Sequence, residues 1–162
     1  MRRRLPPRMS TSIDEQALQS LSNPARDVPH KEPRNMFSHI MIGTNDLEKS
    51  RAFYDATLGA LGVPAGFVDR HRVFWRTPAG VFSVSLPIDG QPATAGNGST
   101  IGFACQSAEQ ADAWHAAGLA AGGSPCEDPP GVRSGPAGRL YLAYLRDPDG
   151  YKICGVHRMP RA

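Results

Sequence analysis

The sequence predicts an α+β fold made of two βαβββ modules that follow one another along the chain. Three observations support this prediction. A segment of 24 residues recurs without gaps 61 positions later, short apolar runs follow each copy, and a turn of the form x-Pro-x-Gly lies among the runs that follow each copy. Self-similarity at a fixed offset indicates that one structural unit is present twice.

The repeat joins residues 39–62 to residues 100–123, and seven of its 24 positions are identical. Phe53 falls on Trp114, so an aromatic side chain is kept as well. The turns at 77–80 and 147–150 match at a different offset, because 147 − 77 is 70 whereas 100 − 39 is 61. The two modules therefore differ by loop insertions between the repeat and the turn.

The repeated segment predicts a strand followed by a helix in each module. Asn45 with Glu48, and Ser107 with Gln110, have the spacing of capping boxes and are expected to begin the two helices. Apolar runs and helical spacing place the first strands at 37–44 and 100–105, and the helices at 46–59 and 108–121.

Three further strands are expected after each helix. The x-Pro-x-Gly turns join the last two strands of each module as hairpins, because Pro presets φ and Gly suits the last turn position. Counting outward from the turns predicts that Val84 lies opposite Val73 and that Cys154 lies opposite Ala143. The expected strands are 66–69, 72–76 and 81–86 in the first module, and 124–127, 140–146 and 151–157 in the second.

Composition sets the expected domain boundaries. Residues 1–35 hold five prolines and few large apolar side chains, which predicts a disordered extension. The domain is expected over 36–158, with module one at 36–88 and module two at 99–158, and a short tail at 159–162.

Charge, hydropathy and cysteine content exclude several classes of protein. Residues 1–35 carry seven basic and four acidic side chains, a net charge of +3, whereas residues 36–162 carry eleven of each. A domain without net charge offers no electrostatic support for a nucleic-acid partner. No apolar run approaches the roughly 20 residues of a membrane helix. Three cysteines without a CxxC pair predict a reducing compartment, and we expect the cytoplasm.

Two segments carry a resemblance to a known family. The opening HIMIGTNDLEKSRAFYDATLGALG (39–62) and the closing YLRDPDGYKICGV (144–156) resemble the vicinal-oxygen-chelate superfamily. That superfamily includes glyoxalase I, bleomycin- and fosfomycin-resistance proteins and extradiol dioxygenases. The resemblance covers about residues 36–158 and implies that the two modules form a curved mixed sheet around a cup.

The resemblance also implies a site for Ni, Zn, Fe or Mn. Its metal-using members carry a His on the first strand of each module, and a carboxylate or Gln on the last strand. His39 matches, but the other three positions hold Thr100, Val84 (or Ser85 after a register slip) and Cys154. We therefore expect no standard four-ligand metal site. A reduced site that keeps His39 and Cys154 stays open, because a thiolate binds soft metals.

The side chains expected on the cup-facing side of the strands are mainly apolar and aromatic. Such a cup suits a small, partly flat organic ligand. Several of these residues could instead be purely structural. Trp75, Phe82 and Tyr141 would then belong to the core, His39 would be a hydrogen-bonded core residue, and Cys154 would be an inert thiol. The Gly/Pro-rich segment 128–139 is either an ordinary surface loop or a lid that brings Arg133 and Arg139 to an anionic ligand. The predicted cup residues are His39, Met41, His71, Trp75, Phe82, Val84, Thr100, Tyr141 and Cys154, with Lys152 as a further polar point.

Three functions are compatible with these observations. The favoured one is a metal-independent binder of a small organic molecule. The alternative is a metal-dependent lyase, isomerase or dioxygenase of the glyoxalase I type with a rebuilt site. The third is a fold that has lost its ligand, since a fold alone does not decide function. The resemblance further implies a homodimer, in which two chains share strands to complete a cup.

Overall fold

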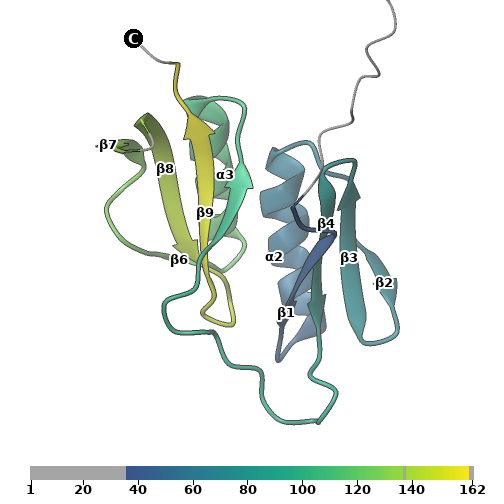
Figure 1. Cartoon of the computed structure of the whole chain (residues 1–162). Coiled ribbons are helices and arrows are strands. Elements are labelled where there is room, and N and C mark those ends of the chain that lie inside the picture. Colours follow the sequence, from purple (N-terminus) through teal and green to yellow (C-terminus); the bar gives the residue numbers. More distant parts are fainter. Residues whose placement is uncertain (1–35, 137, 161–162) are drawn as a thin grey trace, which may run out of the picture. The chain divides into compact units, whose positions relative to one another are not determined.

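The structure is a computed structural model that describes residues 36–136 and 138–160. The expected extension 1–35 lies outside the described residues, as do residues 161 and 162 of the expected tail. The described residues belong to one compact unit. Their elements follow the order of two βαβββ modules, with one additional strand in the second (Figure 1), so the predicted α+β fold is confirmed.

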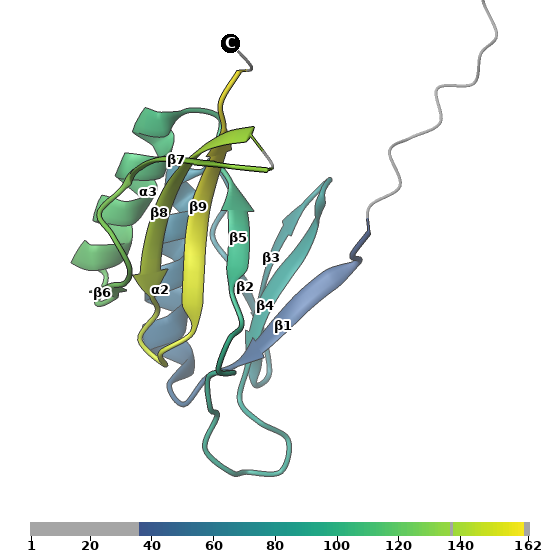
Figure 2. The same ribbon diagram turned by 60° about the vertical axis from the view of Figure 1, so that its left-hand side comes forward.

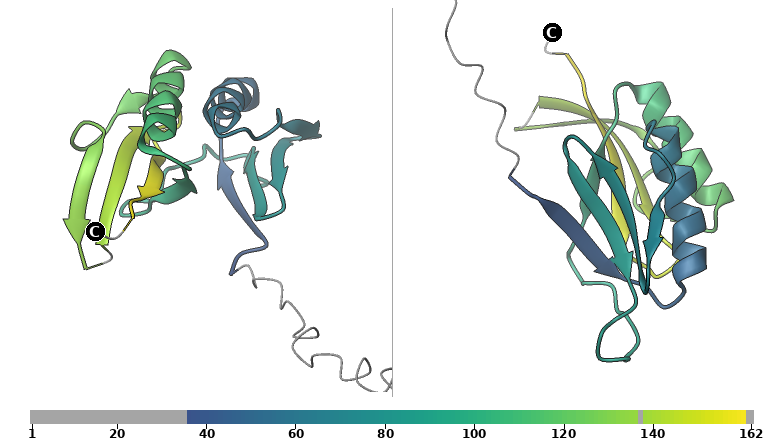
Figure 3. Two further views of the ribbon diagram at one scale, coloured as in Figure 1. Left: turned by 90° about the horizontal axis from the view of Figure 1, so that it is seen from above. Right: turned by 90° about the vertical axis from the view of Figure 1, so that its right-hand side faces the viewer.

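Module one forms a four-stranded mixed sheet with the strand order β1-β4-β3-β2. Strand β1 pairs with β4 in parallel, and the other neighbours are antiparallel. Helix α2 covers one face of this sheet (Figure 3). The elements are β1 (His39–Gly43), α2 (Leu47–Ala60), β2 (Phe67–Asp69), β3 (Arg72–Thr77) and β4 (Gly80–Ser85).

Module two repeats this plan with the strand order β5-β9-β8-β6, and it adds strand β7, which pairs with β8. The segment 128–139, expected as a loop or lid, is therefore largely a β-hairpin in which Gly135 pairs with Gly138. The elements are β5 (Ile101–Ala104), α3 (Ala108–Ala120), β6 (Ser124–Pro125), β7 (Gly131–Gly135), β8 (Gly138–Arg146) and β9 (Lys152–Arg158).

The two helices begin one repeat apart. Ser107 caps α3 by accepting a hydrogen bond from the backbone N–H of Gln110 at 3.2 Å, as predicted. Helix α2 is capped by Asp46, which accepts from the backbone N–H of Lys49 at 3.0 Å. The expected cap Asn45 is therefore wrong by one residue, because the Asn45 side chain is engaged elsewhere.

The core lies between each sheet and its helix, and we call this helix-covered side the inner face and the opposite side the outer face. Tyr54 of α2 places its ring centroid 5.5 Å from that of Trp75 and 4.7 Å from that of Phe82. Trp114 of α3 lies so close to Gly155 that an added Cβ there would come within 2.9 Å of the indole. The helices also pack against each other (Figure 3).

The hairpin registers confirm one prediction and correct the other. Val84 pairs with Val73, as expected from the two-residue turn between Thr77 and Gly80. Cys154 pairs with Tyr144 instead of Ala143. The turn of module two contains one residue more than the counting assumed, because its last strand pair is Arg146 with Lys152.

The longer turn braces module two against module one. Asp149 accepts hydrogen bonds from Thr44 Oγ1 at 2.7 Å, from Ser50 Oγ at 3.1 Å, and from the Asn45 side chain at 2.9 Å. Asp147, which is only 4% exposed, accepts from the Tyr54 hydroxyl at 2.7 Å. We call these contacts of the two aspartates the brace. They join the two modules, in addition to shaping the turn itself.

In the part of the chain that the structure describes, no helix has the length and apolar character that a membrane span requires.

Candidate functional site

The outer face of the first sheet is not covered by a helix of the described chain (Figure 3). Alternate residues of a strand point to one face, and paired residues of neighbouring strands share that face. Register places these residues on the outer face: His39, Met41 and Gly43 of β1, Val81, Ser83 and Ser85 of β4, and Arg72, Phe74 and Arg76 of β3.

This face combines exposed apolar side chains with a few polar groups. Met41 is 41% exposed and Phe67 is 44% exposed. Phe67 pairs with Phe74, and their rings stack with centroids 5.3 Å apart. The Arg76 guanidinium lies over Phe67, 4.7 Å from the ring centroid. Aromatic surface beside a cation is a common composition for recognition of organic molecules.

The imidazole of this face lies on the edge strand β1, and its serine hydroxyls lie on the neighbouring strand β4. His39 is exposed, and its Nδ1 lies 3.0 Å from Ser38 Oγ. Ser83 is fully buried and donates its hydroxyl to the Ile40 carbonyl at 3.2 Å. Ser85 donates to the carbonyl of Leu86 at 2.8 Å. His39 is therefore an accessible polar group at the edge of the sheet, whereas the serine hydroxyls satisfy backbone acceptors.

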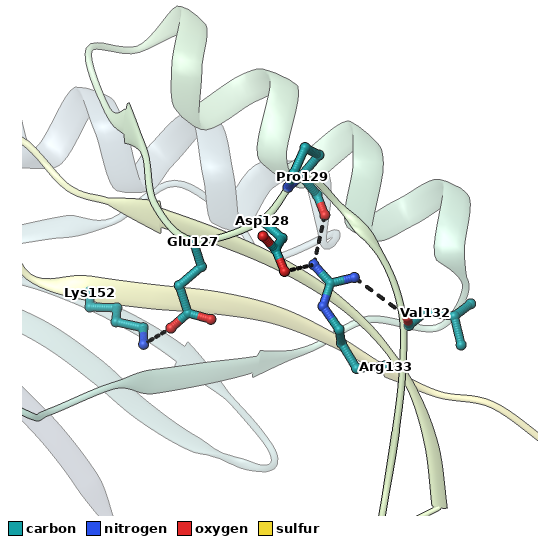
Figure 4. Close-up of polar contacts among 6 residues, drawn as sticks. All are labelled: Glu127, Asp128, Pro129, Val132, Arg133 and Lys152. Carbon is teal, nitrogen blue, oxygen red and sulfur yellow. Dashed lines mark hydrogen bonds and ion pairs between the residues drawn. The ribbon is translucent and has the colours of Figure 1, made fainter.

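The outer face of the second sheet carries Cys154, Tyr144 and Lys152. Burial raises the pKa of the Cys154 thiol to about 11, so the sulfur is protonated at neutral pH. Lys152 forms an ion pair with Glu127 (Figure 4) and lies 4.8 Å from the Tyr144 ring centroid. This side of the site has no reactive thiolate, and its lysine is already paired.

Arg133 belongs to its own hairpin rather than to a ligand site. Its guanidinium donates to the Pro129 carbonyl at 3.0 Å and to the Val132 carbonyl at 3.4 Å, and it lies 3.7 Å from Asp128 (Figure 4). These contacts hold the 127–133 segment in place. Of the two alternatives for this segment, the contacts favour the ordinary loop for Arg133, because its side chain stabilises the loop before β7.

A cavity of about 350 Å³ lies between β1 and β5. Within the described residues, each of these strands pairs on one side only, β1 with β4 and β5 with β9 (Figure 2). Leu58 and Leu61 near the end of α2 close the cavity on the core side. Its other lining residues are Phe37, His39, Ile40, Val63, Trp75, Thr77, Ala79, Gly80, Val81, Phe82 and the four residues of β5.

The predicted cup residues do not share one face. His39 and Met41 lie on the outer face of the first sheet, whereas Trp75, Phe82 and Val84 lie on the inner face. The parallel register causes this, because Ile40 rather than His39 pairs with Phe82. Among the nine residues, His39, Trp75 and Phe82 line the cavity.

The remaining predicted positions are also divided. Cys154 lies on the outer face of the second sheet, but Tyr141 lies on the inner face and donates its hydroxyl to Asp112 of α3 at 2.8 Å. Thr100 is exposed just before β5. His71 lies just before β3, and its Nε2 is buried without a hydrogen-bond partner among the described residues.

Residues that the sequence reasoning missed include Phe74, Arg76 and Ser83. The alternation Arg72-Val-Phe74-Trp-Arg76 along β3 was the available signal, since it separates a charged and aromatic face from an apolar one. The alternation alone does not show which of the two faces is open. That depends on the side that the helix covers and on the register between β1 and β4.

The donor set does not fit a standard metal centre. Cys154 pairs with Gly102, whose counterpart in the repeat is Met41 (102 − 61), and Met41 pairs with Ser83. The position expected at Val84 or Ser85 is therefore Ser83. His39 is then accompanied by two hydroxyls and a protonated thiol, a set without carboxylate or thiolate. Within residues 36–136 and 138–160, no group of three or more His, Cys, Asp or Glu side chains is placed to hold a metal ion.

Comparisons with known proteins agree with this architecture. The family model described as Glyoxalase/Bleomycin resistance protein/Dioxygenase superfamily matches residues 36–154. The chain is similar to the crystal structure of a glyoxalase/bleomycin resistance protein from Albidiferax ferrireducens T118, with 64% sequence identity and a TM-score of 0.75. That match covers 76% of this chain and 99% of that chain.

Two more distant structures share the fold. A glyoxalase-related enzyme from Fulvimarina pelagi is 20% identical with a TM-score of 0.60, and the match covers 77% of this chain and 89% of that one. The lactoylglutathione lyase from Agrobacterium tumefaciens is 20% identical with a TM-score of 0.54, covering 78% and 96%. A search of curated proteins gave no match.

Proposed function

We propose a function from one premise: the chain belongs to the Glyoxalase/Bleomycin resistance protein/Dioxygenase superfamily. Within this family, the protein binds a small organic molecule on the outer face of its first sheet, and this binding needs no metal ion. The proposed binding surface therefore differs from the set of cup residues predicted from the sequence, which included residues of both faces.

The observation that carries the proposal is the composition of the uncovered outer face. Met41 and Phe67 are each more than 40% exposed there, beside Phe74 and the polar groups His39 and Arg76. Exposed apolar surface bordered by a few polar groups is a common property of binding surfaces. The donor set described above supports binding without chelation.

The proposal includes a homodimer. Strands β1 and β5 each leave one edge unpaired within the described chain, and unpaired edges favour pairing with another chain. The cavity lies between these edges and is lined mainly by apolar groups. A second copy of the chain is the proposed cover of this region.

We also propose that the protein works in the cytoplasm. All three cysteines are free, with Cys105 and Cys154 buried and Cys126 half-buried. Unpaired thiols in a folded domain are typical of a reducing compartment.

The test is ligand-observed NMR with the full chain in the presence of a chelator and a panel of flat organic compounds. Binding without added metal is expected, with a loss of roughly tenfold in affinity for Met41→Asp, because a carboxylate is placed on the apolar surface. Leu119→Asp is the matched control, since Leu119 of α3 is similarly exposed at 39%.

Two outcomes would contradict the proposal. Binding that appears only after Ni, Zn, Fe or Mn is added would favour the metal-dependent enzyme instead. An equal loss in both variants would show that the outer face of the first sheet is not the site.

A further inference from the structure

We infer that the ligand of the outer face is an organic anion, and that Arg76 binds its charged group. This inference rests on the proposed function, because it names the chemical class of molecule for the same surface. It differs from the sequence analysis, where recognition of an anion was only one of two alternatives for the segment 128–139, beside an ordinary surface loop.

The charge on the outer face comes from β3. Alternation along this strand places Arg72, Phe74 and Arg76 on the same side. In the described part of the chain, neither arginine forms an ion pair within 4 Å. Asp69 pairs with Arg72 in the register of β2 and β3, so one carboxylate lies near that end. No carboxylate occupies the row of Arg76, which pairs with Val81, and Val81 in turn pairs with His39.

Among the described residues, the Arg76 guanidinium is held in place by aromatic rings and not by hydrogen bonds. It stacks over Phe67 at 4.7 Å and lies 5.9 Å from the centroid of Phe74. A guanidinium that stacks through its flat face keeps the N–H groups at its edge available for a carboxylate or phosphate. The ring contacts thus orient the cation and leave its donors to a ligand.

Several other cations among the described residues are already engaged. Lys152 is paired with Glu127, Arg51 lies 3.5 Å from Asp55, and Arg146 donates to the Gly150 carbonyl at 2.8 Å. Arg72 differs from these, because its Nε is buried and has no hydrogen-bond partner among the described residues.

The spacing sets the size of the ligand. Arg72 and Arg76 are four residues apart on one strand, which is roughly 13 Å. His39 lies two strands away from Arg76, or about 10 Å. A molecule with one anionic group on Arg76 and a flat apolar body over Phe74 therefore reaches the neighbourhood of Met41 and His39.

The experiment uses isothermal titration calorimetry on the full chain at low salt, with three flat probes. These are 2-naphthoate, its neutral analogue 2-naphthamide, and 2-naphthyl phosphate. We expect the wild-type protein to bind an anion at least about tenfold more tightly than the amide, because charged hydrogen bonds are lost with the neutral group. The two anions distinguish a carboxylate ligand from a phosphate ester.

Variants locate the preference. Arg76→Gln is expected to bring the ratio between anion and amide close to one, and Arg76→Lys to keep part of it. Lys49→Gln is the matched control, because Lys49 is an exposed residue of α2 and its positive charge lies away from the outer face. The control is expected to keep the wild-type ratio.

The outcomes separate this inference from the proposed function. If wild-type protein binds the amide as tightly as the anions, the anion inference is wrong and the proposed function stands. If none of the three probes binds, both are wrong for flat ligands. An anion preference that survives Arg76→Gln contradicts the role of Arg76. Should that variant fail to fold, the wild-type ratio and the Arg76→Lys variant decide.

Discussion

At the scale of single residues, Asp147 and Asp149 show how one turn gives two carboxylates opposite properties. Burial raises the pKa of Asp147, even though Tyr54 and two backbone N–H groups donate to it. Burial also opposes ionisation of Asp149, but hydrogen bonds from Thr44, Asn45 and Ser50 outweigh it and lower the pKa. The Asp149 carboxylate is thus stabilised as an anion, whereas the buried Asp147 carboxylate is not.

The first prediction concerns Asp149→Asn. The variant is expected to lose about 1–3 kcal/mol of unfolding free energy at pH 7, because charged hydrogen bonds to the first module are lost. Since the folded-state pKa of Asp149 lies below its unfolded value, its stabilising contribution is present above that unfolded value and disappears as the pH falls through the folded pKa. Urea unfolding at several pH values measures both effects.

Asp147→Asn is the matched comparison. The folded-state pKa of Asp147 is raised, so the wild-type protein gains stability relative to this variant as the pH falls through that pKa. The two differences from wild type should therefore have pH slopes of opposite sign. Slopes of the same sign would contradict the assignment of the two environments.

At the scale of secondary-structure elements, the repeat predicted both helices to within one residue at each end. It succeeded because caps and helical spacing are local properties of the sequence. The second hairpin was misjudged by one residue, since the Asp147 side chain accepts from the backbone of Asp149 and Tyr151 and enlarges the turn. That geometry depends on burial against α2, which the local sequence does not contain.

The candidate site was harder to predict than the fold. Which face of a strand is open depends on the register between β1 and β4, which are separated by a helix and two strands. A slip of one residue exchanges all the side chains of the two faces. His39 and Met41 were placed on the open face, but Trp75, Phe82 and Val84 were grouped with them although they face the helix.

The second prediction concerns the close packing of α3. A Cβ on Gly118 would lie 2.3 Å from Leu145 Cδ1 and 3.1 Å from Thr57 Cγ2. Gly118→Ala is expected to destabilise the protein by about 1–3 kcal/mol, because overpacking exceeds the gain in helix propensity. Thermal unfolding followed by circular dichroism measures the change.

Gly59→Ala is the control for helix propensity. Gly59 lies in α2, and nothing is within 4 Å of the position that its Cβ would take. This variant is expected to be more stable by up to about 1 kcal/mol. Equal effects in the two variants would mean that the contact between α3 and β8 is looser than described.

At the scale of the whole molecule, the proposed dimer gives the third prediction. Light scattering should give twice the chain mass of 17.4 kDa for wild type. Gly102→Lys is expected to favour the monomer, because a charge on an edge strand opposes pairing. The change is tolerated in one chain, since an added Cβ meets only Val156 Cγ2 at 3.5 Å.

Gly135→Lys provides the matched control on β7, where nothing lies within 4 Å of an added Cβ. It is expected to keep the wild-type mass. A dimer that persists in Gly102→Lys would place the interface away from β5.

The groups that form the brace are divided between the two copies of the repeat. Its carboxylates exist only in the second copy, because the corresponding turn of the first copy has Thr77 and Ala79 in their places. Its donors exist only in the first copy, since the repeat replaces Thr44, Asn45, Ser50 and Tyr54 by Cys105, Gln106, Ala111 and His115. Two identical halves of either kind would lack this connection. Each half lacks what the other supplies, so the two modules depend on each other although they share one plan.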